Sequence, residues 1–283
     1  MLLSVPVAVR KFADGIQHPV ALIGCRATGM SLDCCEYDLA VLAPGANQVV
    51  QLDGHTIELL HFGGTAKSFA VEFGRTVMLK DTNKFVLSSA VKEITPEKFQ
   101  RALAAAGKKS LISSLFCQQK MRDVKLPATA MWLKIASYDF IEGMLALSGS
   151  RPMPLHELDQ VRQADSRSMA EGVEVALDCI GVERATRPAI SRSIKAIKEL
   201  NSKDYDKDIF ASKVDHLLGK SMLADCYYYA GRIAAKNLAG RPDPFYNRYS
   251  KLVQLALDLS SDLQSLEKMQ KKLFRAVNSA LKR

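Results

Sequence analysis

The six cysteines and five histidines of this 283-residue chain form no recognisable metal-binding or disulfide pattern. No two cysteines are spaced as Cys-x-x-Cys, and no histidine lies at ligand spacing from a second histidine or a cysteine. The cysteines are Cys25, Cys34, Cys35, Cys117, Cys179 and Cys226. Neither a zinc site nor a disulfide framework is indicated, so we expect reduced thiols.

The chain also lacks a long uncharged apolar run, which argues against a transmembrane helix. Its first residues are apolar, but Arg10 and Lys11 follow this run instead of preceding it, and that order is wrong for a secretory signal. The contents of hydrophobic residues (48%) and charged residues (24%) are ordinary for a soluble globular protein. We therefore expect a cytoplasmic protein that does not enter a membrane.

The charged residues are unevenly distributed along the chain. Residues 1–95 contain eight of the 39 Lys and Arg and nine of the 30 Asp and Glu, which gives that part a net charge of −1. The remaining 31 bases and 21 acids give residues 96–283 a net charge of +10. This surplus fits an anionic substrate or a partner such as RNA, and it fits a solvated, lysine-rich helical surface equally well.

The most informative stretch runs from Ala21 to Ala43. An apolar run ends at Gly24 and Cys25, a segment of small and turn-forming residues follows, and a second apolar run carries Glu36 and Asp38 at alternate positions. Residues two apart in a strand point to the same face, so these two carboxylates are expected to project together. Such a pair suits Mg²⁺, which takes one or two carboxylates together with substrate phosphates.

This pattern resembles the nucleotidyltransferase fold superfamily of the DNA polymerase β type, whose members include antibiotic and tRNA-terminal nucleotidyltransferases and small nucleotide-binding antitoxins. The residues that carry the resemblance are G-C-R-A-T-G at 24–29 and E-Y-D-L-A-V-L at 36–42, within roughly the first third of the chain. The resemblance implies a Mg²⁺-dependent nucleotidyltransferase that moves a nucleoside monophosphate from an NTP to an acceptor hydroxyl. Glu36 and Asp38 would hold the metal ions, and the nature of the acceptor stays open.

The resemblance also implies a third acid on a neighbouring strand. Asp53-Gly54 lies between two apolar runs and predicts a hairpin turn. Glu58, in the middle of the returning strand, is the candidate for the third metal-binding and catalytic acid, which would help to deprotonate the acceptor hydroxyl. Asp53 competes for this role, but its place in the turn already explains it.

Three residues after the first strand are candidates for nucleotide binding. Gly24 would let the backbone approach phosphate closely, and Cys25 follows it at the position where the family usually has Ser or Gly. Arg26 suits either a phosphate contact or a surface salt bridge. The thiol of Cys25 is a weaker donor than a hydroxyl, and Glu36 is one methylene longer than the usual Asp. These two departures keep open an alternative, a catalytically inactive module of the same fold that binds nucleotide, nucleic acid or a protein partner.

Together with the resemblance, the pattern of apolar residues predicts an α+β fold with two domains, a small mixed β-sheet nucleotidyltransferase-like domain at 1–95 and an α-helical domain at 96–283. In the first, we expect a helix at 4–13, strands at 20–23 and 37–42, a hairpin at 49–62, a helix at 65–73, and a last strand at 76–79 with its exit at 85–87. Helices are expected at 96–106, 110–122, 128–147, 155–163, 169–180, 191–200, 209–218, 220–238 and 246–281. This plan resembles that of small-molecule and antibiotic nucleotidyltransferases, in which the helices help to form the acceptor site.

Two features of the second domain have simple structural interpretations. The consecutive tyrosines Tyr227, Tyr228 and Tyr229 are expected to pack in the core with a wet edge. Arg232, Lys236 and Arg241 form a basic group, for which a solvated helix face is favoured over a contact with phosphate or RNA.

Overall fold

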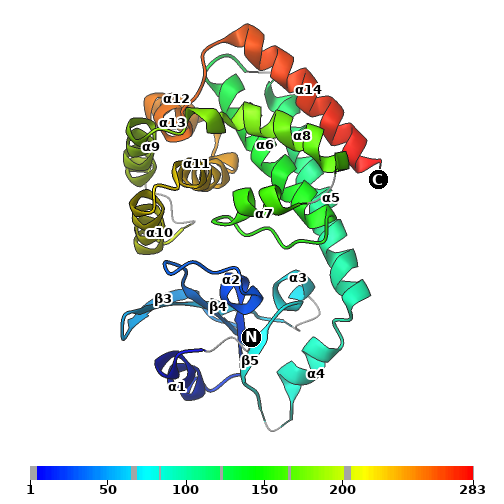
Figure 1. The fold of residues 1–283 in the computed structure, drawn as a ribbon, viewed down its shortest axis with the longest axis vertical. Coiled ribbons are helices and arrows are strands. Elements are labelled where there is room, and N and C mark those ends of the chain that lie inside the picture. The colour runs from blue at the N-terminus through cyan, green and yellow to red at the C-terminus, as the bar shows by residue number, and fades with distance from the viewer. Residues whose placement is uncertain are drawn as a thin grey trace. The chain divides into compact units, whose positions relative to one another are not determined.

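The computed structural model describes residues 5–64, 69–82, 84–121, 124–164, 167–200 and 205–282. The chain divides into two compact units, residues 1–103 and 104–283. Figure 1 shows a sheet with short helices in the first unit and helices alone in the second. The predicted α+β class is therefore confirmed.

A five-stranded mixed sheet forms the centre of the first unit. In chain order the strands are β1 (Val20–Ile23), β2 (Tyr37–Val41), β3 (Gln48–Leu52), β4 (His55–His61) and β5 (Val77–Lys80). Their spatial order is β3-β4-β2-β1-β5. The pair of β2 and β4 is parallel, and the other neighbouring pairs are antiparallel. As predicted, Asp53 and Gly54 form the turn of the β3–β4 hairpin, both with positive φ.

The sheet is covered on both faces, which explains why β1 and the inner part of β2 are almost wholly apolar. One face packs with helix α1 (Val7–Gly15) through Val9 and Ala13. The other face packs with Phe73 and Leu87 from the short helices α3 (Ala70–Phe73) and α4 (Val86–Lys92). Strands β1 and β2 therefore lie between two layers of apolar side chains, one on each face of the sheet.

Helix α4 replaces the strand exit that was predicted at 85–87, and that prediction is wrong. Asp81 explains the helix, because its Oδ1 accepts hydrogen bonds from the amides of Thr82 (2.8 Å) and Leu87 (3.1 Å). Its Oδ2 accepts from the amide of Ser88 at 2.8 Å and from the Ser88 hydroxyl at 2.5 Å. A carboxylate that binds the free amides of a first turn stabilises a helix start. The predicted helix at 65–73 is described only from residue 69 onward, since 65–68 lie outside the described residues.

The second unit is built from helices. They are α5 (Pro96–Lys120, whose first residues belong to the first unit), α6 (Ala128–Leu147), α7 (Glu157–Gln163), α8 (Arg167–Ile180), the 3₁₀ turn η3 (Val182–Arg184), α9 (Arg187–Leu200), α10 (Lys207–Gly219), α11 (Leu223–Ala239), α12 (Asp243–Arg248), α13 (Ser250–Leu257) and α14 (Leu263–Leu281). Helix α6 has the predicted bounds and is buried over most of its length, which makes it the centre of this unit. Within the described ranges, no helix is both long enough and apolar enough to span a bilayer.

Two predicted helix boundaries are wrong. The break expected near Gly107 does not occur, because α5 runs through it without interruption. A Cβ at Gly107 would lie 2.8 Å from the carbonyl oxygen of Gly143 in α6, so this glycine permits a close helix crossing. The single helix expected at 246–281 is instead three helices, interrupted at Tyr249 and at residues 258–262, where Asp258 has a φ of 47°.

Candidate metal centre

The three predicted acids come from adjacent positions in the sheet. Asp38 in β2 is the register partner of Glu58 in β4, and neighbouring parallel strands lie about 5 Å apart. Glu36 precedes β2 directly and lies two residues before Asp38. In extended chain this spacing places Glu36 and Asp38 on the same face.

The structure brings these three carboxylates together. One carboxylate oxygen each from Glu36, Asp38 and Glu58 lies within 4.8 Å of the other two. Glu36 is buried, with a relative exposure of 8%, while Asp38 and Glu58 are half-buried. Carboxylates at this spacing repel one another, and a cation bound between them relieves that repulsion.

Gly24 lies directly against one of these acids. It follows β1, in which the preceding residue Ile23 is the register partner of Asp38. A Cβ at position 24 would be 1.9 Å from Oδ2 of Asp38, and the φ of Gly24 is +73°. Both the space and the backbone conformation therefore require glycine. The sequence suggested that Gly24 lets the backbone approach phosphate closely. In this structure the group that lies close to Gly24 is the carboxylate of Asp38.

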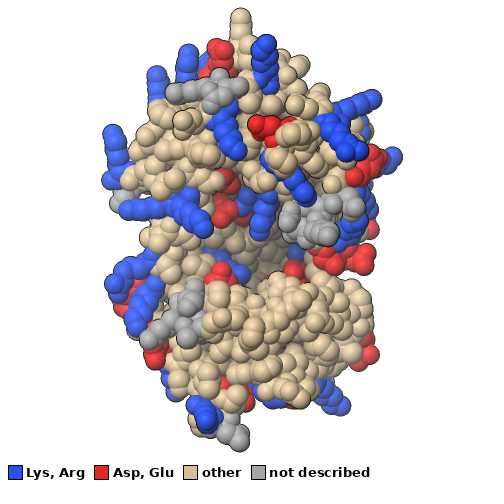
Figure 2. Space-filling view, turned by 180° about the vertical axis from the view of Figure 1, so that it is seen from behind, with Lys and Arg blue, Asp and Glu red and all other residues tan. Residues whose placement is uncertain are grey.

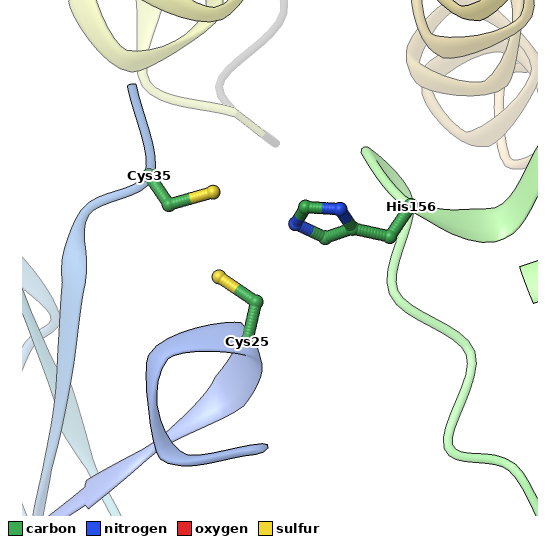
Figure 3. Close-up of side chains that lie close together, drawn as sticks. All are labelled: Cys25, Cys35 and His156. Atoms are coloured by element: carbon green, nitrogen blue, oxygen red, sulfur yellow. The ribbon is translucent and has the colours of Figure 1, made fainter. Parts of the chain in front are cut away.

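Cys25 faces another cysteine. Cys25 is the second residue of the short helix α2 (Gly24–Thr28), and Cys35 lies just before β2. Figure 3 shows the two sulfur atoms pointing toward each other, and they lie within 4.8 Å; His156, labelled in the same view, belongs to the helical unit. The hydrogen bond with Cys35, burial and the charges of Asp38 and Glu36 raise the pKa of the Cys25 thiol far above its usual range. Cys25 is therefore a protonated, buried thiol at the edge of the acid cluster.

Arg26 holds the loop that leads to the acids. Its Nε donates to the carbonyl oxygens of Cys35 (2.9 Å) and Glu36 (3.1 Å). Its Nη2 donates to the carbonyls of Asp33 (3.3 Å) and Cys35, and the guanidinium lies 4.1 Å from the ring centre of Tyr37. These contacts fix the backbone around Glu36. Neither of the two roles expected for Arg26 includes this one, and a phosphate contact stays a prediction.

The helical unit contains a second group of three acids, which surrounds Arg232. This arginine in α11 forms ion pairs with Asp139 (3.9 Å) and Glu142 of α6 and with Glu157 of α7 (3.3 Å). The hydroxyl of Tyr228 also donates to Glu157 at 2.9 Å. The side chain of Arg232 is only 8% exposed, so the expectation of a solvated basic face is wrong for this residue, whereas Lys236 is exposed. The physical reason is that the face of α11 carrying Arg232 packs on α6 and α7, and acids on those helices neutralise it.

The predicted core packing of the consecutive tyrosines is confirmed, whereas the wet edge expected with it is not found. Tyr227, Tyr228 and Tyr229 are each at most 5% exposed. The hydroxyl of Tyr227 donates to Asp258 at 2.9 Å, and Tyr228 forms an edge-to-face contact with Tyr138. A buried phenol needs a hydrogen-bond partner of this kind.

A search with models of known protein families finds no match for this chain, and a search of curated proteins finds none either.

Proposed function

We propose that the sheet unit is the catalytic part of a Mg²⁺-dependent nucleotidyltransferase that moves a nucleoside monophosphate from an NTP to an acceptor hydroxyl. The observation that carries the proposal is the convergence of Glu36, Asp38 and Glu58 within 4.8 Å. These acids come from two strands and the loop before one of them, so their proximity depends on the fold of the sheet. The resemblance in the segment from Gly24 to Leu42 adds the expectation that the site handles a nucleoside triphosphate.

The donor set fits the proposed metal. All three side chains offer carboxylate oxygens, which Mg²⁺ prefers, whereas structural zinc sites are built mainly from cysteine sulfur and histidine nitrogen. When bound, Mg²⁺ neutralises charge on the phosphates and orients the reacting oxygens. Asp38 is held against Gly24, and the loop of Glu36 is held by Arg26. This support orients two of the three ligands before a metal binds.

The protein side chains then have separate roles. Glu36, Asp38 and Glu58 would together hold the metal, which would bind the triphosphate. Glu58 would also accept the proton of the acceptor hydroxyl as that hydroxyl attacks the α-phosphorus and pyrophosphate leaves. Glu58 lies on β4, whereas Asp38 lies on β2 and Glu36 directly before it.

The class of acceptor is open in this proposal. The helical unit carries the excess of basic residues, which would suit an anionic acceptor or RNA. In Figure 2, however, Lys and Arg side chains are spread over the helical unit and do not gather in one patch on that face. The proposal therefore includes three classes of acceptor: a hydroxyl of a small molecule, of a nucleic acid or of a protein.

One observation favours a second candidate, a nucleotide-binding module without catalysis. The thiol of Cys25 is engaged with Cys35, whereas the family usually offers a hydroxyl at this position to phosphate. The longer Glu36 side chain also changes the geometry available to an octahedral metal. Both candidates require the NTP to bind, but only the first requires pyrophosphate release.

Calorimetric titration of the four NTPs with and without Mg²⁺, on the unchanged chain and on Asp38→Asn, tests the proposal. We expect at least one NTP to bind only with Mg²⁺ and to lose that binding in the variant. Asp14→Asn, which changes an exposed acid of the same unit, is the control and should bind as the unchanged chain does. If no NTP binds to the folded chain, both candidates fail. Binding without pyrophosphate release in the presence of candidate acceptors would favour the non-catalytic module.

A further inference from the structure

A buried lysine lies in the apolar central helix of the helical unit. Lys134 of α6 is 4% exposed, and neighbouring positions along the helix are also buried. Its Nζ donates to the carbonyl oxygen of Leu257 at 2.6 Å and is 3.1 Å from the hydroxyl of Tyr227. The nitrogen is the donor in both contacts, and a neutral amine has two protons for them. Its lone pair is therefore left for a reaction partner.

Lys134 borders a cavity of about 160 Å³ within the helical unit. The wall includes Ala130 on α6, Asp178 and Cys179 on α8, Glu183 and Arg184 on η3, and Ser265 and Leu266 on α14, so it carries two acids as well as Arg184. An apolar cavity of about 150 Å³ holds a molecule as large as benzene. The space beside Lys134 is therefore sufficient for a compound of about six non-hydrogen atoms.

The surroundings favour the neutral amine of Lys134. Burial, followed by the charge of Arg184, lowers the pKa of Lys134 to about 7. Asp258, Glu183 and the nearby Cys179 act in the opposite direction without cancelling this shift. A lysine that is desolvated and lies beside another cationic group is a nucleophile at neutral pH, unlike an exposed lysine.

Arg184 adds a site for a negative charge. Its side chain is 37% exposed, and its ion pairs with Asp258 and Glu183 are long, at 3.4 and 3.8 Å. A guanidinium in loose pairs of this kind can form a closer two-bonded contact with an incoming carboxylate. The cavity thus combines a nucleophilic nitrogen with a carboxylate-binding group.

We propose that this cavity binds a small 2-oxo acid and that Lys134 forms an imine with its carbonyl carbon. The nitrogen lone pair forms the new C–N bond, and the carbonyl electron pair moves to oxygen. Both amine protons then leave with that oxygen as water, which gives the C=N bond without an oxidant or reductant. Arg184 binds the carboxylate. This inference is independent of the metal centre in the sheet unit.

Reductive trapping with pyruvate and cyanoborohydride tests the proposal, and peptide mass spectrometry gives the rate at each lysine. We expect Lys134 to be modified at least tenfold faster than exposed lysines at pH 7.5, with a rate that saturates as pyruvate increases.

Two matched variants separate the roles of the residues. Lys134→Met should lose the rapid modification, and Lys272→Met, which changes an exposed lysine of α14, should keep it at Lys134. Arg184→Gln should raise the half-saturating concentration of pyruvate at least fivefold and leave that of pyruvamide, which has no carboxylate, unchanged. Asp14→Asn, which changes an exposed acid of the sheet unit, should leave the modification of Lys134 unchanged.

Modification of Lys134 in the unchanged chain at the rate of exposed lysines, or without saturation, would overturn the proposal. This measurement does not depend on whether Lys134→Met folds. If Arg184→Gln raised the half-saturating concentrations of pyruvate and pyruvamide equally, Arg184 would not be the group that binds the carboxylate. The assignment of the ligand as a 2-oxo acid would then be wrong.

Discussion

Each unit of this protein gathers three acidic side chains, and the two groups differ in what lies among them. In the helical unit, Asp139, Glu142 and Glu157 surround the guanidinium of Arg232, which supplies the compensating charge from the protein itself. In the sheet unit, oxygen atoms of Glu36, Asp38 and Glu58 converge on one another. The first arrangement holds helices together, whereas the second is suited to an added cation.

The largest effect should follow from removing the central cation of the helical group. Arg232→Met leaves three acids close together in a largely buried place, so we expect a loss of about 3–5 kcal/mol in the free energy of unfolding. Thermal unfolding measures this loss, which corresponds to a decrease of roughly 10 °C in Tm. Arg192→Met is the control, because Arg192 lies at an exposed position of α9. Its loss should be about 0.5 kcal/mol or less, and equal losses would contradict a structural role for Arg232 and its three acids.

The next effect should come from the glycine beside Asp38. Gly24→Ala places a methyl group where Oδ2 of Asp38 lies, so we expect a decrease of at least tenfold in the affinity for Mn²⁺. Gly29→Ala is a close control, because Gly29 has a similar φ of +79° but open space around its Cβ position. Both variants should lose about 1 kcal/mol of stability through backbone strain. Only Gly24→Ala should lose metal affinity, and an equal loss in both would show that strain alone is responsible.

A smaller effect of opposite sign is expected for one of the acids. Asp38→Asn removes a like charge from the sheet group, so the chain without metal should become more stable by about 1 kcal/mol. Added Mg²⁺ should stabilise the unchanged chain and not the variant. Thermal unfolding with and without Mg²⁺ measures both effects. A destabilisation as large as that of Arg232→Met would mean that the sheet group is a structural cluster as well.

The smallest effect is expected at Cys25. Cys25→Ser supplies the stronger hydroxyl donor at the position where the family that the sequence resembles usually has Ser or Gly, so the affinity for an NTP with Mg²⁺ should rise by about threefold. Cys34→Ser, at a half-buried position in the segment between α2 and β2, is the control and should leave the affinity unchanged. Calorimetry measures both variants. Weaker binding by Cys25→Ser would assign the thiol pair a structural role that a hydroxyl cannot fill.

The sequence was sufficient for the elements with the strongest local pattern. The apolar run Val20–Ile23, the Asp53-Gly54 turn and the long apolar helix Ala128–Leu147 all lie where they were predicted. The proximity of Glu36 and Asp38 follows from their spacing of two residues. The position of Glu58 could not be predicted from spacing, because only the resemblance indicated that its strand lies beside β2.

The errors arise where distant residues decide the structure. Gly107 reads as a helix break in sequence, but its partner Gly143 makes it a contact point between two helices. Arg232 reads as an exposed base, because the acids that bury it lie on other helices, more than 70 residues earlier in the chain. Lys134 was not singled out, and its one sequence signal was a lysine within an otherwise apolar helix. The approach of Cys25 to Cys35 depends on a loop whose path no short pattern defines.

The most direct test of the central claim is a titration with Mn²⁺ followed by electron paramagnetic resonance, since Mn²⁺ accepts the same oxygen ligands as Mg²⁺. The unchanged chain should bind the ion at one saturable site from which Mg²⁺ displaces it. Asp38→Asn and Glu58→Gln should each weaken that site at least tenfold, and Asp14→Asn should leave it intact. A chain that binds Mn²⁺ equally well with and without the carboxylates of Asp38 and Glu58 would contradict the assignment of these acids as a metal centre.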